Sequence, residues 1–206
     1  MKKFFSVCLT FLLFSCADSE PTNINELYVK EEKVDTWVVN KIFFDASDTK
    51  KAFSGEIIEY HEDGSFLSQY NVKRGRRIDT NIQSFYSNGN LYEKVSIGEL
   101  GYRVGLREVY YKNGNLAWRG NYLPEMKGIE NIESYYENGN LKNFISLISF
   151  DTSTPGDYYT YVEGKYELYY ENGNLERVTD YQSGFKMKEE KYNLEQKKIH
   201  QLDYLD

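Results

Sequence analysis

The apolar and polar positions of the chain repeat one short pattern: an aromatic residue, a turn and an apolar residue. Five segments align without gaps about a glycine that follows Asn or Asp. Successive glycines lie 25, 25, 25 and 34 residues apart. A fixed period of this kind predicts tandem copies of one supersecondary unit. The five glycines are Gly64, Gly89, Gly114, Gly139 and Gly173.

Each unit is predicted to be a β-hairpin with its tip at the Asn-Gly or Asp-Gly pair. We expect a two-residue type I′ turn there, because this pair tolerates the positive φ angles that the turn needs. An aromatic residue stands four positions before each glycine, and Leu or Phe stands two positions after it. These two positions should face each other across the hairpin and form a continuous buried stripe. The aromatic members are Tyr60, Phe85, Tyr110, Tyr135 and Tyr169.

Composition supports the same fold class. The chain has 20 Tyr and 12 Phe but only four Ala, and aromatic residues favour strands whereas Ala favours helices. We therefore expect an all-β protein, an elongated antiparallel sheet of tandem hairpins in a single repeat domain. The formal net charge of -7 argues against a nucleic-acid partner, since phosphates would be repelled.

The repeats have predicted caps at both ends. Residues 53–192 hold the five units, and residues 27–52 predict N-terminal capping strands, centred on the apolar segment 36–44. Residues 193–206 predict a C-terminal cap. This cap, with the charged residues before it, favours a last hairpin whose charges block further strand pairing, and a short terminal helix is the alternative.

The longer final spacing has a separate explanation. Residues 151–157 are rich in turn-forming types, so they predict a loop inserted between two regular units.

The N-terminus predicts export and a lipid anchor. Residues 1–15 have a basic start and an apolar run that is too short to span a bilayer, which is typical of a signal peptide. The segment Leu13-Phe14-Ser15-Cys16 resembles a bacterial lipobox, and this resemblance implies that Cys16 carries the lipid. Residues 16–26 would then be the lipidated cysteine and a flexible tether. The alternative is an ordinary secreted protein that is cleaved elsewhere. We expect a lipid-anchored cell-envelope protein, with the outer membrane favoured and the leaflet unassigned.

Candidate catalytic and metal-binding groups are few. Cys8 and Cys16 are the only cysteines, and His61 and His200 the only histidines. His61 occupies a column that holds tyrosine in the other units, so we interpret it as an aromatic substitute rather than a base. No metal site and no cofactor are expected. Two carboxylates could in principle serve a glycosidase. However, Glu108, Glu133 and Glu167 recur at one repeat position, which favours a ladder of surface charge.

The second aromatic of the later units is the candidate binding platform. It is Tyr86, Tyr111, Tyr136 or Tyr170, three positions before the glycine, and strand alternation places it opposite the apolar stripe. A row of tyrosines offers rigid contact area to a protein or a glycan. The alternative is that these rings only stabilise a thin sheet.

The recurring core Tyr-Tyr-x-Asn-Gly-Asn-Leu resembles the bacterial MORN-repeat variant over about residues 53–192. That resemblance implies tandem hairpins and a scaffold or membrane-associated role. The family is also described as antitoxin-like. We expect a non-enzymatic scaffold of the cell envelope that binds a protein partner of unknown identity. The alternatives are an envelope glycan-binding or glycan-active protein and an antitoxin or immunity-like protein.

Overall fold

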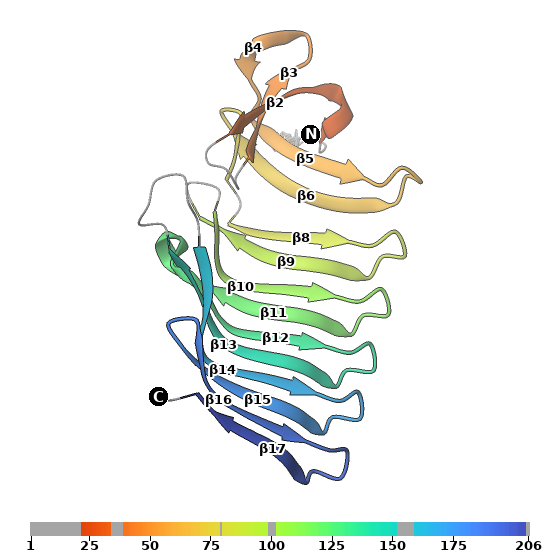
Figure 1. Cartoon of the computed structure of the whole chain (residues 1–206). Coiled ribbons are helices and arrows are strands. Elements are labelled where there is room, and N and C mark those ends of the chain that lie inside the picture. Colours follow the sequence, from red (N-terminus) through yellow and green to blue (C-terminus); the bar gives the residue numbers. More distant parts are fainter. Residues whose placement is uncertain (1–21, 34–38, 79, 99–101, 152–158, 205–206) are drawn as a thin grey trace, which may run out of the picture.

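The repeats form one long sheet of consecutive hairpins. The computed structural model describes residues 22–33, 39–78, 80–98, 102–151 and 159–204. A fourteen-stranded, mostly antiparallel sheet holds the repeats, and a separate three-stranded sheet lies at its N-terminal end (Figure 1). The all-β class and the tandem hairpins are thus confirmed.

Six hairpins follow one another along the large sheet, with their tips along one rim (Figure 1). The 3-10 helix η2 (Pro124–Met126) connects the third hairpin to the fourth, and the short strand β7 (Arg76–Arg77) pairs with the first. The hairpins are β5 (Gly55–Tyr60) with β6 (Phe66–Lys73), β8 (Asn81–Phe85) with β9 (Leu91–Ile97), β10 (Arg103–Tyr110) with β11 (Leu116–Tyr122), β12 (Gly128–Tyr135) with β13 (Leu141–Asp151), β14 (Tyr159–Tyr169) with β15 (Leu175–Gln182), and β16 (Phe185–Tyr192) with β17 (Lys198–Asp203).

The N-terminal segment covers the first hairpin. Strand β1 (Thr22–Asn23) pairs in parallel with β5, and the 3-10 helix η1 (Ile24–Glu26) follows it. The small sheet consists of β2 (Leu27–Lys33), β3 (Val39–Asp45) and β4 (Asp48–Ala52). These strands lie within residues 27–52, for which capping strands are predicted.

A buried cluster joins the small sheet to the first hairpin. Phe43 of β3 packs with Ile57, Tyr70 and Val72, all at most 3% exposed. The Phe43 main-chain N–H also donates to the carbonyl of Gly75 at 2.9 Å. Burying a large apolar side chain contributes roughly 1.5–3 kcal/mol, so this cluster is a major stabilising contact for an otherwise thin sheet.

The hairpin tips differ from the expected two-residue turn. In the third hairpin, Gly114 N–H donates to the Tyr111 carbonyl, and Tyr111 N–H donates to the Asn115 carbonyl. Three residues therefore form the loop, in the arrangement of a type I turn followed by a left-handed glycine. In all five tips the glycine φ is positive, between 83° and 92°, whereas the preceding Asn or Asp is not among the residues with positive φ. The type I′ prediction is wrong because only one left-handed residue is needed.

The predicted aromatic–aliphatic pairs do face each other, for example Tyr110 and Leu116. A β-bulge beside each pair restores the register, with Ala117 as the extra residue in this hairpin. We call this side of the sheet the pair face. Its aromatic members are Tyr60, Phe85, Tyr110, Tyr135, Tyr169 and Tyr192.

The pair face is not the buried one, contrary to expectation. Its first pair, Tyr60 and Phe66, is 43% and 37% exposed, and the later pairs are only half-buried. Burial concentrates on the opposite side of the sheet, which we call the reverse face. In the first strand of each hairpin, the residue three positions before the paired aromatic points to this face, because side chains alternate along a strand. These residues are Ile57, Ile82, Arg107, Ile132, Tyr166 and Glu189.

The C-terminal tail forms a hairpin rather than a helix, and it is a sixth copy of the unit. Gln196 occupies the glycine position, with a positive φ of 65°. Asn193 takes the place of the second tyrosine, because its N–H and carbonyl pair with Lys197 and Gln196 as in the other tips.

The predicted inserted loop lies mostly outside the described residues, between β13 and β14, which are each eleven residues long.

Candidate binding surface

The second tyrosine of each repeat bonds to the next hairpin. Tyr111 Oη donates to the Tyr135 carbonyl at 2.6 Å. Tyr86, Tyr136 and Tyr170 make the equivalent bonds, to Tyr110, Tyr169 and Tyr192, at 2.7, 2.9 and 3.1 Å. The predicted platform residues therefore form a ladder that ties hairpin to hairpin. Their hydroxyls are engaged within the sheet, which favours the stabilising role. Binding through their half-exposed rings stays a prediction.

The two asparagines of the motif form a second ladder. In the third hairpin, Asn113 Nδ2 and Asn115 Nδ2 both donate to the Glu137 carbonyl, at 3.3 and 2.7 Å. Asn113 Oδ1 also accepts from the Asn115 N–H, which closes the turn locally. Asn88 and Asn90 reach the Lys112 carbonyl in the same way, and Asn138 and Asn140 reach that of Glu171. The motif thus encodes contacts between units as well as within them.

The first hairpin is joined differently. His61 replaces the tyrosine, and its Nε2 lies 2.8 Å from the Phe85 carbonyl, so the histidine takes the tyrosine's place. Asp63 has no amide to donate, and its Oδ1 accepts from the N–H and Oγ of Ser65. Between β6 and β8, the strand pairing consists of the single pair Ser68 and Ser84. The ring of Phe66 lies 5.4 Å from that of Phe85. Among the described strands that join consecutive hairpins, this joint has the fewest paired residues.

The repeated glutamates of the pair face are bonded to the tyrosine two residues on. Tyr169 Oη donates to Glu167 Oε2 at 2.7 Å, and Tyr135 donates to Glu133. Burial opposes ionisation of Glu133, but bonds from Arg119 and Tyr135 outweigh it, so its pKa is lowered. A glycosidase acid needs a raised pKa. The lowered pKa therefore argues against Glu133 as a general acid and favours a charged carboxylate held by Arg119 and Tyr135.

The reverse face carries a compact aromatic and cationic group in the third hairpin. Arg107 Nε donates to Glu93 Oε1 at 2.6 Å, and the guanidinium lies 5.2 Å from the ring centre of Trp118. Trp118 and Tyr122 have ring centres 6.4 Å apart. Burial alone would lower the Arg107 pKa, but the bond to Glu93 raises it, so the charge is held. Gly120 leaves room for this packing, since a Cβ there would lie 2.7 Å from the Trp118 ring.

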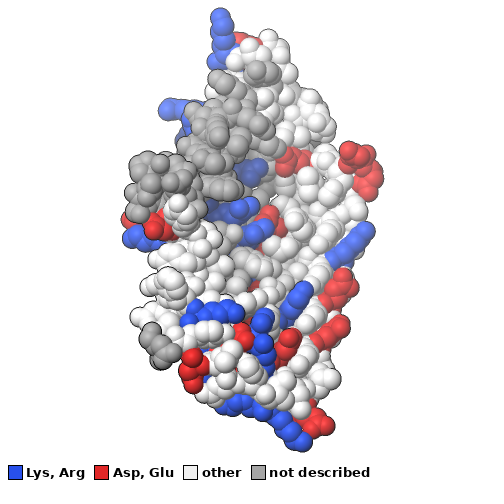
Figure 2. All heavy atoms as spheres, viewed as in Figure 1, with Lys and Arg blue, Asp and Glu red and all other residues white. Residues whose placement is uncertain are grey.

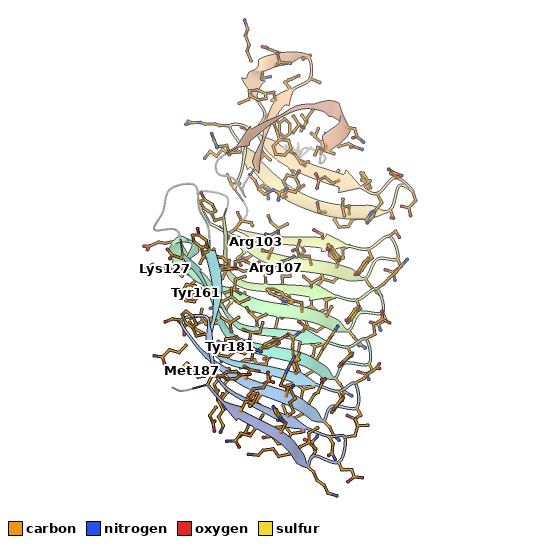
Figure 3. The ribbon with its side chains drawn as sticks, in the orientation of Figure 1. Arg103, Arg107, Lys127, Tyr161, Tyr181 and Met187 are labelled. Atoms are coloured by element: carbon orange, nitrogen blue, oxygen red, sulfur yellow. The ribbon has the colours of Figure 1, made fainter. Side chains whose placement is uncertain are left out.

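Further side chains continue this surface along the array. Figure 3 shows Arg103, Arg107, Tyr161, Tyr181 and Met187 at successive levels of the array, towards the strand ends away from the hairpin tips. They come from β10, β14, β15 and β16. The hairpin-tip rim differs, because charges of both signs line it (Figure 2). The reverse face therefore offers aromatic and cationic groups from several repeats.

Two other residues singled out from the sequence are Cys16 and His200. Cys16 lies outside the described residues, and His200 is exposed on β17. Within the described ranges there is no group of three metal-ligating side chains, and no helix there has the length and apolar character to cross a bilayer.

Sequence reasoning missed the Arg107, Trp118 and Tyr122 group. The one sign of this group in the sequence is that Trp118 stands at a repeat position where the other units have Ser, Glu, Asn, Arg or His.

Comparison with known proteins supports the repeat assignment. The model of the family described as MORN repeat variant matches residues 103–123 and 162–183, which cover most of the third and fifth hairpins. No curated protein matches the chain. The recurring motif and the six hairpins extend the same architecture beyond the matched segments. The chain therefore contains MORN repeats of the variant type, set in one long sheet of consecutive hairpins.

Proposed function

We propose that this protein is a non-enzymatic, lipid-anchored scaffold of the cell envelope that binds a protein partner on the reverse face of its sheet. The observation that carries the proposal is the group of Arg107, Trp118 and Tyr122. Trp, Tyr and Arg are the residue types that dominate binding energy at protein interfaces. Here they lie together on a surface that extends over several hairpins.

The ladders between hairpins support a scaffold role. Each tyrosine and asparagine bond fixes one unit relative to the next, as Tyr86 and Asn90 do between the second and third hairpins. A surface that is already ordered has less conformational entropy to lose on binding. In this proposal the tyrosine and asparagine ladders hold the hairpins in place, and a different set of side chains, the Arg107 group, contacts the partner.

The partner is tested by cross-linking in the producing cell. A photo-reactive residue at Asn143, which lies on the reverse face two strands from Trp118 in the same row, should form an adduct with a protein. The matched control is the same probe at Lys94, which is exposed on the pair face. Trp118→Ala and Arg107→Gln should each remove the Asn143 adduct while the β-type circular dichroism is retained. Equal adducts from both faces, or none from Asn143, would contradict the proposal. An adduct with a polysaccharide would support the glycan-binding alternative.

The anchor is tested separately. Metabolic labelling with a fatty acid should mark the full chain and leave Cys16→Ser unlabelled. Label that persists in Cys16→Ser would rule out the lipid at this residue, whatever the cross-linking result.

A further inference from the structure

The last two hairpins place basic side chains side by side on the reverse face. Arg177 of β15 is directly opposite Lys191 of β16, and Lys191 is directly opposite His200 of β17. Lys186, near the start of β16, lies on the same side and pairs with Tyr181. Three neighbouring strands thus present a continuous row of basic groups at the end of the array farthest from the small N-terminal sheet (Figure 1).

One buried carboxylate sits among these groups. The Glu189 side chain is 5% exposed and lies 3.2 Å from Lys191 Nζ, 3.4 Å from Lys186 Nζ and 3.9 Å from Arg177 Nη1. Three cations minus one anion leave two positive charges that Glu189 does not balance. The cationic side chains are 33% to 44% exposed, so they remain open to solvent.

This arrangement places like charges next to each other, which opposes folding. Like charges directly opposite on neighbouring strands are destabilising, as are Arg177 and Lys191 here. The same two columns hold Ser84 and Glu93 in the second hairpin and Ser134 and Asn143 in the fourth. The cationic row is therefore a local departure from the repeat, in a chain whose net charge is -7.

The pair face of the same hairpins has the opposite character. There Lys188 and Lys198 both bond to Glu190, at 2.9 and 3.0 Å. Asp180 and Asp203 also act on Lys188 there and raise its pKa, after the larger effect of Glu190. The lysines of the pair face are thus matched by Glu190, Asp180 and Asp203, whereas on the reverse face three cations surround the single carboxylate of Glu189.

We propose that Arg177, Lys186 and Lys191 form a site for a phosphate group. Their charged ends come from two strands and converge on one carboxylate, so they can approach a second, external anion together. Arginine offers a fork that matches phosphate oxygens, and lysines add point charges. The phosphate belongs either to a free inorganic ion or to a phospholipid headgroup. The site is separate from the Arg107 group and does not depend on the scaffold proposal.

The test is a titration of the full chain in a neutral detergent, followed by calorimetry and by backbone amide shifts. The probes are inorganic phosphate, a soluble short-chain phosphatidylglycerol, and a short-chain phosphatidylcholine as the zwitterionic control. We expect saturable binding of at least one anionic probe, with shifts confined to β15–β17. Binding of both probes indicates general phosphate recognition. Preference for the phosphatidylglycerol identifies a headgroup, and preference for inorganic phosphate identifies a free ion.

Variants separate a binding site from simple neutralisation of Glu189. Lys186→Gln with Lys191→Gln should weaken binding tenfold or more, whereas Lys188→Gln, on the same strand but the pair face, should leave it within twofold. Glu189→Gln should tighten binding several-fold, because it removes the competing anion. Circular dichroism checks the fold of each variant. Absence of saturable binding, equal loss in Lys188→Gln, or no gain in a folded Glu189→Gln would overturn the proposal.

Discussion

The hydroxyl of Tyr111 donates a 2.6 Å hydrogen bond to the main-chain carbonyl of Tyr135, one hairpin farther along the sheet. The same bond recurs from Tyr86, Tyr136 and Tyr170. The second tyrosine of the motif is therefore an inter-repeat connector. Its regular recurrence in the sequence reflects the need to hold the next unit in register.

Removal of one connector should cost measurable stability. Tyr111→Phe keeps the ring but loses the bond, so we expect the free energy of unfolding to fall by about 0.5–1.5 kcal/mol. The measurement is urea denaturation followed by circular dichroism. Tyr159→Phe is the matched control, because that ring is 61% exposed at a strand end, and its effect should stay within about 0.5 kcal/mol. Equal effects of the two changes would contradict the ladder.

The turn geometry predicts a cost for a side chain at the glycine position. Gly114 has a φ of +92°, and a Cβ there would meet nothing within 4 Å. Gly114→Ala should therefore lower stability by about 1 kcal/mol through backbone strain alone. Ser183→Ala, at φ 50° in the exposed turn between β15 and β16, should change stability by less than about 0.5 kcal/mol, since the native residue already has a side chain in this conformation and Ala keeps the bond from its N–H to Glu163. Thermal unfolding of both variants checks this difference.

The weakly paired joint between the first and second hairpins should be strengthened by two substitutions at the tip of the first. Asp63→Asn with Ser65→Asn supplies the two amides that the other tips use, and the expected acceptor is the Ser87 carbonyl. We predict slower amide hydrogen exchange in β5 and β6, equivalent to about 1 kcal/mol of added protection. The control is Glu62→Gln in the same loop. Exchange rates that do not change in the double variant would show that the amide ladder does not limit this joint.

The free energy of unfolding should depend on pH through the ionisation of Glu190. Bonds from Tyr192, then Lys188 and Lys198, lower its pKa from the ordinary 4.5 to about 2. A pKa lowered by folding contributes stability above the unfolded pKa, and this is lost as pH falls through the folded pKa. The stability difference between the native chain and Glu190→Gln should therefore be full above about pH 4.5 and shrink towards pH 2. Urea midpoints across this range check it, and a difference that is constant with pH would refute it.

Much of the architecture follows from local sequence signals. Aromatic–aliphatic pairing at Tyr110 and Leu116 was predicted, because both flank a turn signal that fixes which residues face each other. The turn type was predicted wrongly, since Asn-Gly suits both a two-residue and a three-residue loop. The last hairpin was predicted as a charged cap but not as a sixth copy of the repeat, because Gln196 replaces the glycine that marks the other tips.

The sequence by itself determined the period, the hairpins and the strand-forming composition, since these depend on residues close together in the chain. Only the tertiary structure decided which face is buried, because burial depends on what covers a sheet, as Phe43 covers Ile57 and Tyr70. It also decided the role of the tyrosines, whose acceptors lie 22 to 33 residues away. The grouping of Arg107 with Trp118, and of Arg177 with Lys191, likewise results from strand pairing. Neighbours across strands are set by register, and register acts over distances that no single motif spans.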